Sequence, residues 1–548
     1  MKTKLGLLII LLSVFFVYEN INAQAPGWLW ANGAGGSDYD YGTGISSDAS
    51  GNVLVTGYFH SPSITFGTTN LTNAGDDDLF VVKYDASGNV IWAKSAGGAD
   101  NDDGSGISTD ASGNVLATGY FYSDSITFGM TTLSNSGSSD IFIAKYDTTG
   151  NGLWAKSIGG NNQDYSSGIS TDASGNVMVI GYFRSTSITF GTTILTNTNV
   201  GSSDIFIAKY DASGNVLWAK SAGGANYDYS YGISTDVSGN VLITGGFESD
   251  SMTFGTITLT NAGAKNIFVV KYDPLGNVLW AKSIEGSDID DGVGISTDVN
   301  GNVLVTGDFY SPSITCGTIA LANEGNSDVF IAKYDTSGNV LWAKSAGGTG
   351  YDYGAGISTD ANGNVLVTGF FDSPSITFGT TTLTNGGNNG TPDIFILKFN
   401  AMGNTLWAKS VGGTSNDYDY GISTDVNGNI LLTGGFFSPS ITFGTTTLTN
   451  AGVRDFFVAK LDNITGIADA STPLSMTSVF PNPSTGQISI TSSKIIDDVT
   501  ITNPLGQVVY QAKLKDKKLF LQIKDDGIYF VTLTSDKKTS TGKIIVQH

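Results

Sequence analysis

A short phrase centred on tryptophan recurs along most of this chain, and no other feature restricts the fold as strongly. Six copies read Leu/Ile-Trp-Ala-Lys-Ser and one reads Leu-Trp-Ala-Asn, with 62 to 65 residues between successive tryptophans. The seven are Trp30, Trp92, Trp154, Trp218, Trp280, Trp342 and Trp407. Two further phrases, Gly-Ile-Ser-(Ser/Thr)-Asp and one like Asp-Ile-Phe-Ile-Ala-Lys-Tyr-Asp, also occur seven times. A fixed period of this length indicates copies of one structural unit.

Each unit is predicted to contain four antiparallel strands. In the first copy they are expected at Gly44–Asp48, Asn52–Phe59, Leu79–Asp85 and Asn89–Ser95. An Asp-Ala-Ser-Gly-Asn turn joins the first two strands and another joins the last two, and both favour hairpins because Asp and Ser bond to the local backbone and Gly accepts positive φ. The insertion between the middle strands, residues 61–73 in the first copy, predicts a small extra hairpin. Four such strands per repeat are typical of a β-propeller blade.

The two ends of the repeat array are incomplete in a complementary way. A lone tryptophan strand, Trp28–Asn32, precedes the first full unit, and the seventh unit ends at Asp462 without that strand. An open stack of repeats would instead need capping units. In a ring, the two fragments make one sheet and remove an exposed edge. The sequence therefore predicts an all-β protein with a seven-bladed β-propeller over residues 24–462, closed by an N-terminal strand.

The repeats resemble the SBBP family of bacterial β-propeller repeats, over roughly residues 27–462. This resemblance implies a propeller but no particular activity, since propellers host many functions. The Asp-x-x-Gly-x-x-x-Trp spacing, as from Asp211 to Trp218, also resembles the tryptophan-docking motif of pyrroloquinoline-quinone dehydrogenases. Those enzymes usually have eight blades and often a vicinal disulfide, whereas this chain has seven units and one cysteine, so their cofactor is not expected. We expect each tryptophan to pack against the next blade; ligand stacking is the alternative.

Both termini carry features of an exported protein. Residues 1–23 have a basic start and an apolar segment, Leu5–Val17, that is short for a membrane span, so we predict a signal peptide and no transmembrane segment. The tail contains Val479-Phe-Pro-Asn-Pro483, Asp526-Gly-Ile-Tyr-Phe530 and Lys543-Ile-Ile-Val546. These motifs resemble the type A sorting domain of the type IX secretion system of Bacteroidota, over residues 478–548, while residues 463–477 are interpreted as a linker. Membership implies contact with the secretion machinery, passage across the outer membrane, and a secreted or cell-surface product. The strand pattern alone predicts a small β-sandwich.

Charge and reactive residues limit the classes of function. The net charge of −22 disfavours nucleic acid and anionic membranes and favours cations or basic partners. Cys316 is the only cysteine and is interpreted as a small apolar filler. The only histidines are His60 and His548, so a histidine metal site or a Ser-His-Asp triad is not expected.

The loops entering the first strand of each unit provide candidate site residues. An Asp recurs there at Asp40, Asp102, Asp164, Asp228, Asp290, Asp352 and Asp417, followed by Tyr41, Asp103, Tyr165, Tyr229, Asp291, Tyr353 and Tyr418. We expect these loops to share a face with the insertions. Three interpretations remain open: each Asp fixes its loop by accepting backbone N–H bonds; calcium binds at Asp38, Asp40, Asp100, Asp102, Asp103, Asp288, Asp290 and Asp291; or the Tyr and Asp residues contact a carbohydrate or peptide. A tyrosine that only supports its loop is the structural alternative.

Taken together, these patterns favour a non-enzymatic binding or interaction module with a protein or carbohydrate ligand and no certain cofactor. The alternatives are a glycan-active enzyme or lectin that uses these loops, and an architectural surface protein. An Asp pair present in one blade and absent from the others would favour the enzyme, and Asp103 and Asp291 are the positions to inspect because they replace Tyr.

Overall fold

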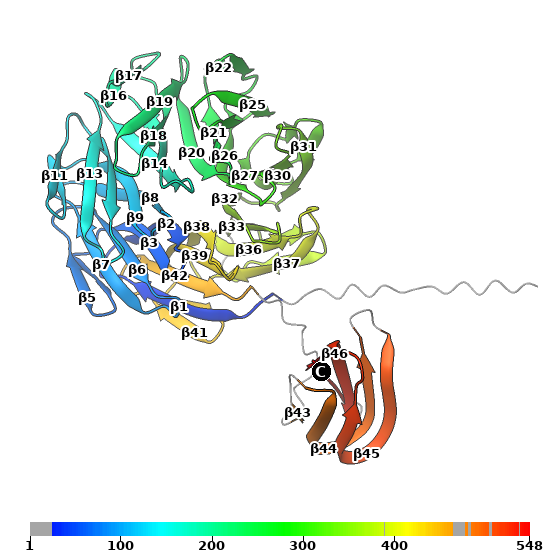
Figure 1. The fold of residues 1–548 in the computed structure, drawn as a ribbon. Coiled ribbons are helices and arrows are strands. Elements are labelled where there is room, and N and C mark those ends of the chain that lie inside the picture. The colour runs from blue at the N-terminus through cyan, green and yellow to red at the C-terminus, as the bar shows by residue number, and fades with distance from the viewer. Residues whose placement is uncertain are drawn as a thin grey trace, which may run out of the picture. The chain divides into compact units, whose positions relative to one another are not determined.

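The computed structural model describes residues 25–387, 390–463, 477–480, 484–503, 507–535 and 538–547. The predicted signal peptide and nearly all of the predicted linker lie outside these ranges. The described residues form β-strands and turns, without a helix, in two compact units that divide after Ile464 (Figure 1). Accordingly, these residues contain no helix of the length and apolarity that a membrane span requires.

The first unit repeats one four-stranded antiparallel arrangement. Among the described residues there are seven such sheets, each with its strands hydrogen-bonded in the order first, second, third and outer. The first strands are β2 (Asp40–Ser47), β8 (Asp102–Thr109), β14 (Asp164–Thr171), β20 (Asp228–Thr235), β26 (Asp290–Thr297), β32 (Asp352–Thr359) and β38 (Asp417–Thr424). The second strands are β3 (Val53–Phe59), β9 (Val115–Phe121), β15 (Val177–Phe183), β21 (Val241–Phe247), β27 (Val303–Phe309), β33 (Val365–Phe371) and β39 (Ile430–Phe436). The third strands are β6 (Asp78–Tyr84), β12 (Asp140–Tyr146), β18 (Asp204–Tyr210), β24 (Asn266–Tyr272), β30 (Asp328–Tyr334), β36 (Asp393–Phe399) and β42 (Asp455–Leu461). The outer strands of the first six sheets are β7 (Val90–Ala96), β13 (Gly152–Ile158), β19 (Val216–Ala222), β25 (Val278–Glu285), β31 (Val340–Ala346) and β37 (Thr405–Val411).

The outer strand of the seventh sheet comes from the start of the chain. Strand β1 (Trp28–Ala34) pairs antiparallel with β42, with Trp30 opposite Lys460 and Ala34 opposite Phe456. The seventh sheet therefore has the order β38, β39, β42, β1.

Local sequence explains the hairpins, and a bulge explains where the strand prediction was wrong. In the first turn, Asp48 Oδ1 accepts hydrogen bonds from the amides of Ser50 at 2.9 Å and Asn52 at 3.0 Å, and Gly51 has φ 79°. The first strand, however, begins at Asp40 and not at Gly44. A bulge after Gly42 lets the ladder between β2 and β3 extend to Asp40. The regular alternation of residues on which the prediction was based does not include a bulge.

The insertions form the predicted two-stranded hairpins. Their strand pairs are β4 (Ser63–Phe66) with β5 (Thr69–Thr72), β10 (Ser125–Phe128) with β11 (Thr131–Ser134), β16 (Ser187–Phe190) with β17 (Thr193–Thr196), β22 (Ser251–Phe254) with β23 (Ile257–Thr260), β28 (Ser313–Cys316) with β29 (Ile319–Ala322), β34 (Ser375–Phe378) with β35 (Thr381–Thr384), and β40 (Ser440–Phe443) with β41 (Thr446–Thr449). Strand β28 also pairs with β25, which extends the fourth sheet. In the fifth unit, Cys316 is fully buried, and burial raises the pKa of its thiol to about 12, in keeping with the predicted apolar filler.

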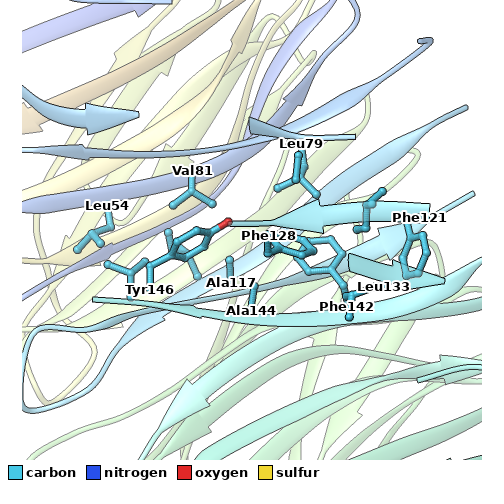
Figure 2. Close-up of a cluster of buried hydrophobic side chains, with 14 of the residues drawn as sticks. Leu54, Leu79, Val81, Ala117, Phe121, Phe128, Leu133, Phe142, Ala144 and Tyr146 are labelled. Carbon is cyan, nitrogen blue, oxygen red and sulfur yellow. The ribbon is translucent and has the colours of Figure 1, made fainter. Parts of the chain in front are cut away.

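The core lies between successive sheets. Figure 2 shows Leu54 and Val81 of the first sheet packed with Phe142 and Tyr146 of the second. The same kind of cluster joins Phe456 of the seventh sheet to Phe80 of the first. Burial of these faces is the main source of stability for a repeat of this kind.

The recurring tryptophans connect each outer strand to the next sheet, as predicted. Trp92 Nε1 donates a hydrogen bond to the carbonyl of Thr148 at 3.1 Å, in the outer turn of the second sheet. Its ring lies against Gly150, where an added Cβ would come within 2.8 Å of the ring and where φ is 84°. Only glycine therefore fits under the indole. The equivalent indole bonds are made by Trp30, Trp154, Trp218, Trp280 and Trp342.

Each sheet also contains a buried ion pair that the sequence analysis did not predict. Lys209 of the third strand places Nζ 3.0 Å from Oδ2 of Asp172, in the turn between the first and second strands. Burial acts to raise the pKa of Asp172, but hydrogen bonds from Asn176 and Lys209 hold it below its ordinary value. Lys209 Nζ also reaches the carbonyl of Pro274 in the next sheet at 3.4 Å. The other six pairs are Lys83–Asp48, Lys145–Asp110, Lys271–Asp236, Lys333–Asp298, Lys398–Asp360 and Lys460–Asp425.

The second unit is a five-stranded antiparallel sheet. Its strands are β43 (Thr477–Phe480), β44 (Gln487–Thr502), β45 (Val508–Gln522), β46 (Gly527–Ser535) and β47 (Lys538–Val546). The long strand β44 pairs with β45, with β43 over its first part and with β46 over its second part. Ile490, Ile501, Val531 and Ile544 are buried in its core. The described strands thus belong to one sheet, in place of the two sheets expected for a sandwich.

Candidate binding face

The seven recurring aspartates are buried inside their loops. Asp102 Oδ2 accepts hydrogen bonds from the amide of Gly98 at 2.7 Å and from Oγ of Ser123 at 2.8 Å. The same carboxylate-to-serine bond occurs in every unit, to Ser61, Ser123, Ser185, Ser249, Ser311, Ser373 and Ser438. All seven aspartates have 0% exposure, so their carboxylates are not part of the exposed surface. Because each serine begins an insertion, these bonds place the loops and insertions on the same face.

Side-chain direction separates the candidate calcium ligands. Successive residues of a strand point to opposite sides of the sheet, so Asp103 points away from the side that Asp102 occupies. Asp38, in contrast, is partly exposed, with 39% of its side chain accessible. Among the described residues no group of three or more His, Cys, Asp or Glu side chains is placed to hold a metal ion. The three aspartate clusters noted in the sequence do not converge into such a group.

Five of the seven residues that follow the buried aspartates are tyrosines, and these form an aromatic belt with residues of the second strands. Tyr41 stacks on Tyr58 at 4.7 Å between ring centroids, and Tyr165 contacts Tyr120 of the preceding sheet at 4.7 Å. We define the tyrosine belt as Tyr41, Tyr58, Tyr120, Tyr165, Tyr182, Tyr229, Tyr353, Phe370 and Tyr418, all of which are partly exposed. The belt therefore presents rings and phenol groups on the face that carries the insertions.

Two second-strand positions beside the belt are glycines, and a cation covers each of them. Gly246 and Gly435 occupy second-strand positions that carry side chains in the other units. Lys265 lies over Gly246, where an added Cβ would collide with it, and Arg454 lies over Gly435. The guanidinium of Arg454 lies 3.8 Å from the centroid of Tyr41 and its Nη2 donates to the hydroxyl of Tyr420 at 2.8 Å.

These cations were not identified from the sequence, although a signal for them exists. In the fourth unit a bulge tyrosine, a glycine and a cation occur together as Tyr231, Gly246 and Lys265; the seventh unit repeats the combination as Tyr420, Gly435 and Arg454. The bulge position in the remaining units is Thr43, Ser105, Ser167, Val293 or Ala355. Comparing the units position by position would have shown that the three residues change together.

The two acidic members of the series have different surroundings. Asp291 pairs with Lys265, whose Nζ is 2.7 Å from Oδ1. It also lies opposite Asp308 in the ladder of β26 with β27. Burial, followed by the charge of Asp291, raises the pKa of Asp308 well above its ordinary value. Asp103 instead lies opposite Tyr120, and its Oδ2 accepts a hydrogen bond from the Tyr120 hydroxyl at 2.5 Å.

Comparison with known proteins identifies the tail. Residues 478–547 match the family model described as the secretion system C-terminal sorting domain. The chain is 24% identical over 506 residues to an uncharacterized WD repeat-containing protein, L264, of Acanthamoeba polyphaga mimivirus, covering 76% of this chain and 36% of that protein. It is 24% identical over 320 residues to the regulatory protein FlaEY of Caulobacter vibrioides, covering 54% of this chain and 33% of that protein. The chain thus spans about a third of the length of these curated relatives.

One solved structure to which the chain is similar is PorZ, a surface component of the type IX secretion system of Porphyromonas gingivalis. It is 11% identical, with a TM-score of 0.21, covering 92% of this chain and 81% of that one. From the sorting-domain match and the repeated sheets, the protein carries a secretion system C-terminal sorting domain that follows a propeller-like, all-β repeat unit in the sequence.

Proposed function

We propose that this chain is a closed seven-bladed β-propeller that acts as a non-enzymatic binding module, secreted or held at the cell surface. The proposed divisions are a signal peptide at 1–23, the propeller at 24–462, a linker at 463–477 and the sorting domain at 478–548. Two contacts between the seventh and first sheets support closure. Ser47 Oγ donates to the carbonyl of Thr424 at 2.9 Å, and a Cβ on Gly421 would lie 3.2 Å from Cγ2 of Ile45.

The tyrosine belt is the observation that carries the binding proposal. Its rings remain partly exposed around one face. Tyrosine combines a large apolar ring with a hydrogen-bonding group, which suits contact with a carbohydrate or a polypeptide. The opposite ends of the sheets end in Asp-x-x-Gly-Asn turns that are occupied by their own hydrogen bonds, as at Asp48.

Array binding tests this proposal. The purified full-length protein is applied to glycan and peptide arrays, and the ligands found are titrated against Tyr165→Ala and Tyr353→Ala. Each change should weaken binding about tenfold, which corresponds to ~1.4 kcal/mol. Ser87→Ala, in an exposed turn at the opposite ends of the strands, is the control and should have no effect. Equal affinity in all variants would contradict a role for the belt.

Export is tested separately by removing the tail. A chain that ends before Ser478 should accumulate in the periplasm, while the complete chain reaches the surface or the medium. Fractionation with a protease-accessibility assay measures the difference. Normal surface display of the shortened chain would contradict sorting by this domain.

A glycan-active enzyme is the second candidate, and one observation favours it. Asp291 and Asp308 are an acidic pair found in the fifth sheet alone among the seven; Lys265 Nζ lies 2.7 Å from Asp291, and burial raises the pKa of Asp308 well above its ordinary value. A carboxyl group whose pKa is raised by burial can serve as a general acid beside a second carboxylate. Hydrolysis of an array glycan that is lost in Asp308→Asn would establish this function in place of simple binding.

A further inference from the structure

The junction between the fourth and fifth sheets contains an ammonium site that the protein fills itself. Lys265 Nζ lies 2.7 Å from Oδ1 of Asp291 and donates to the hydroxyl of Tyr231 at 3.0 Å. The same nitrogen lies 4.9 Å from the ring centroid of Tyr229. A carboxylate, a phenol oxygen and an aromatic face thus surround one buried ammonium, a combination that stabilises organic cations.

The junction between the first and second sheets has the same carboxylate without the lysine. Asp103 occupies the position of Asp291, whereas Asp77 occupies the position of Lys265. The junction between the first and second sheets therefore has two carboxyl groups, whereas the junction between the fourth and fifth sheets has an ion pair at the same positions. Asp77 has a partner, since its Oδ1 lies 3.1 Å from Nδ1 of His60. Within residues 25–463 that the structure describes, no lysine, arginine or histidine forms an ion pair with Asp103.

One oxygen of Asp103 is left without a partner. Oδ2 accepts the hydroxyl of Tyr120, but Oδ1 is buried and makes no hydrogen bond. A buried carboxylate oxygen in this state is costly unless a donor or cation reaches it. Burial and the nearby charge of Asp77 also raise the pKa of Asp103, to about 7, despite the bond from Tyr120.

We propose that this junction binds the ammonium group of a lysine side chain from a partner polypeptide. The proposal rests on the binding function above and specifies its ligand. The protein's own cations support lysine over arginine as the ligand. Lys265 occupies the site that contains a carboxylate, whereas Arg454 occupies a site lined by aromatic rings. The acidic net charge of −22 favours approach of a basic chain, and the belt residues on either side offer rings to the residues that flank the lysine.

A peptide titration tests the proposal. The probe is acetyl-Gly-Gly-Lys-Gly-Gly-amide, added to the full-length protein and followed by calorimetry, and the same peptide with norleucine at the centre has the side chain without its charge. We expect the lysine peptide to bind and the norleucine peptide to bind at least tenfold more weakly. Asp103→Asn should weaken binding of the lysine peptide at least tenfold, whereas Asp85→Asn, in an exposed turn at the opposite ends of the strands where the sixth unit has Asn400, should leave it unchanged. Equal binding to Asp103→Asn, or equal binding of the two peptides, would overturn the proposal.

A transplant of the fourth-sheet residues gives a second test. The triple variant Thr43→Tyr, Tyr58→Gly, Asp77→Lys gives the first junction its own ammonium, so it should lose peptide binding and melt at a higher temperature than the natural protein. Peptide binding that survives in this folded variant would contradict the site.

The remaining outcomes distinguish lysine from other ligands and test the proposed binding function separately from this site. If methylamine binds as tightly as the peptide, the ligand of this site is a small amine and not a polypeptide. If calcium displaces the peptide, the ligand is a metal ion and not lysine. Either result overturns the proposal. Array ligands that depend on Tyr165 but not on Asp103 would retain the binding function while rejecting this site. If the lysine site fails and no array ligand depends on the belt, the binding function fails as well.

Discussion

Removing the N-terminal strand should destabilise the repeat unit severely. The change is deletion of Gly27–Gly36, which contains all of β1. Its ladder with β42 has six residue pairs, and at about 1 kcal/mol for each of roughly six backbone hydrogen bonds the deletion costs about 6 kcal/mol. Loss of the contact between Trp28 and Phe443, with centroids 4.8 Å apart, increases this cost. A domain has only about 5–15 kcal/mol in total, so cooperative melting should shift by many degrees or disappear.

Circular dichroism melting of the deleted and complete proteins measures this effect. A synthetic peptide of residues 25–36, added in excess, should restore part of the lost stability because it can pair with the exposed edge of β42. Point changes on β1 provide a matched pair if the deleted chain does not fold. Ala31 is 8% exposed within the core, so Ala31→Asp should cost about 3 kcal/mol, whereas Leu29 is 50% exposed and Leu29→Asp should cost under about 0.5 kcal/mol. An unchanged melting temperature after deletion, or equal effects of the two point changes, would refute closure by this strand.

Three further outcomes follow from buried groups. Lys209→Met should cost about 3–5 kcal/mol in urea denaturation because Asp172 then lacks its buried cation, and adding Asp172→Asn should recover much of the loss; an isolated cost below about 1 kcal/mol would contradict the role of the pair. Burial raises the pKa of the loop carboxyls to about 6 at Asp102 and about 7 at Asp40, so the folded state binds more protons than the unfolded state. Their stabilising effect is complete below about pH 4 and is lost as pH rises to about 7, so the melting temperature should fall across this interval, and a rise in scanning fluorimetry would contradict it. Alkylation of Cys316 at pH 8 should be about 1,000-fold slower in the folded protein than in denaturant, because a thiol pKa of about 12 leaves little thiolate; comparable rates would show that the thiol is accessible.

The sequence repeat predicted the repeated sheets because each recurring residue makes the same local turn or contact in all seven units. The Asp48 turn, the small hairpin and the docking of Trp92 could each be anticipated from residue types at a fixed spacing. The pairing of Lys209 with Asp172 could not, because it joins a third strand to a turn about forty residues earlier, and an isolated lysine next to a strand end is normally solvent-exposed. The start of β2 was missed because a bulge leaves no simple mark in the alternation of residues.

The candidate site illustrates how recurrence and function differ in a repeat protein. Asp40 and its equivalents were chosen because they recur, and recurrence selected groups that bond within every loop and are buried. Positions that vary between units are not needed for the contacts that all units share. Their side chains can therefore differ and give one part of the surface its own chemistry. Gly246 and Gly435 make room for cations, and Asp103 and Asp291 bring carboxylates into an aromatic belt. Three of these four residues face a cation from the chain itself. Because Asp103 is the exception among these four, the charge at the junction between the first and second sheets must be balanced from outside the protein or by a proton.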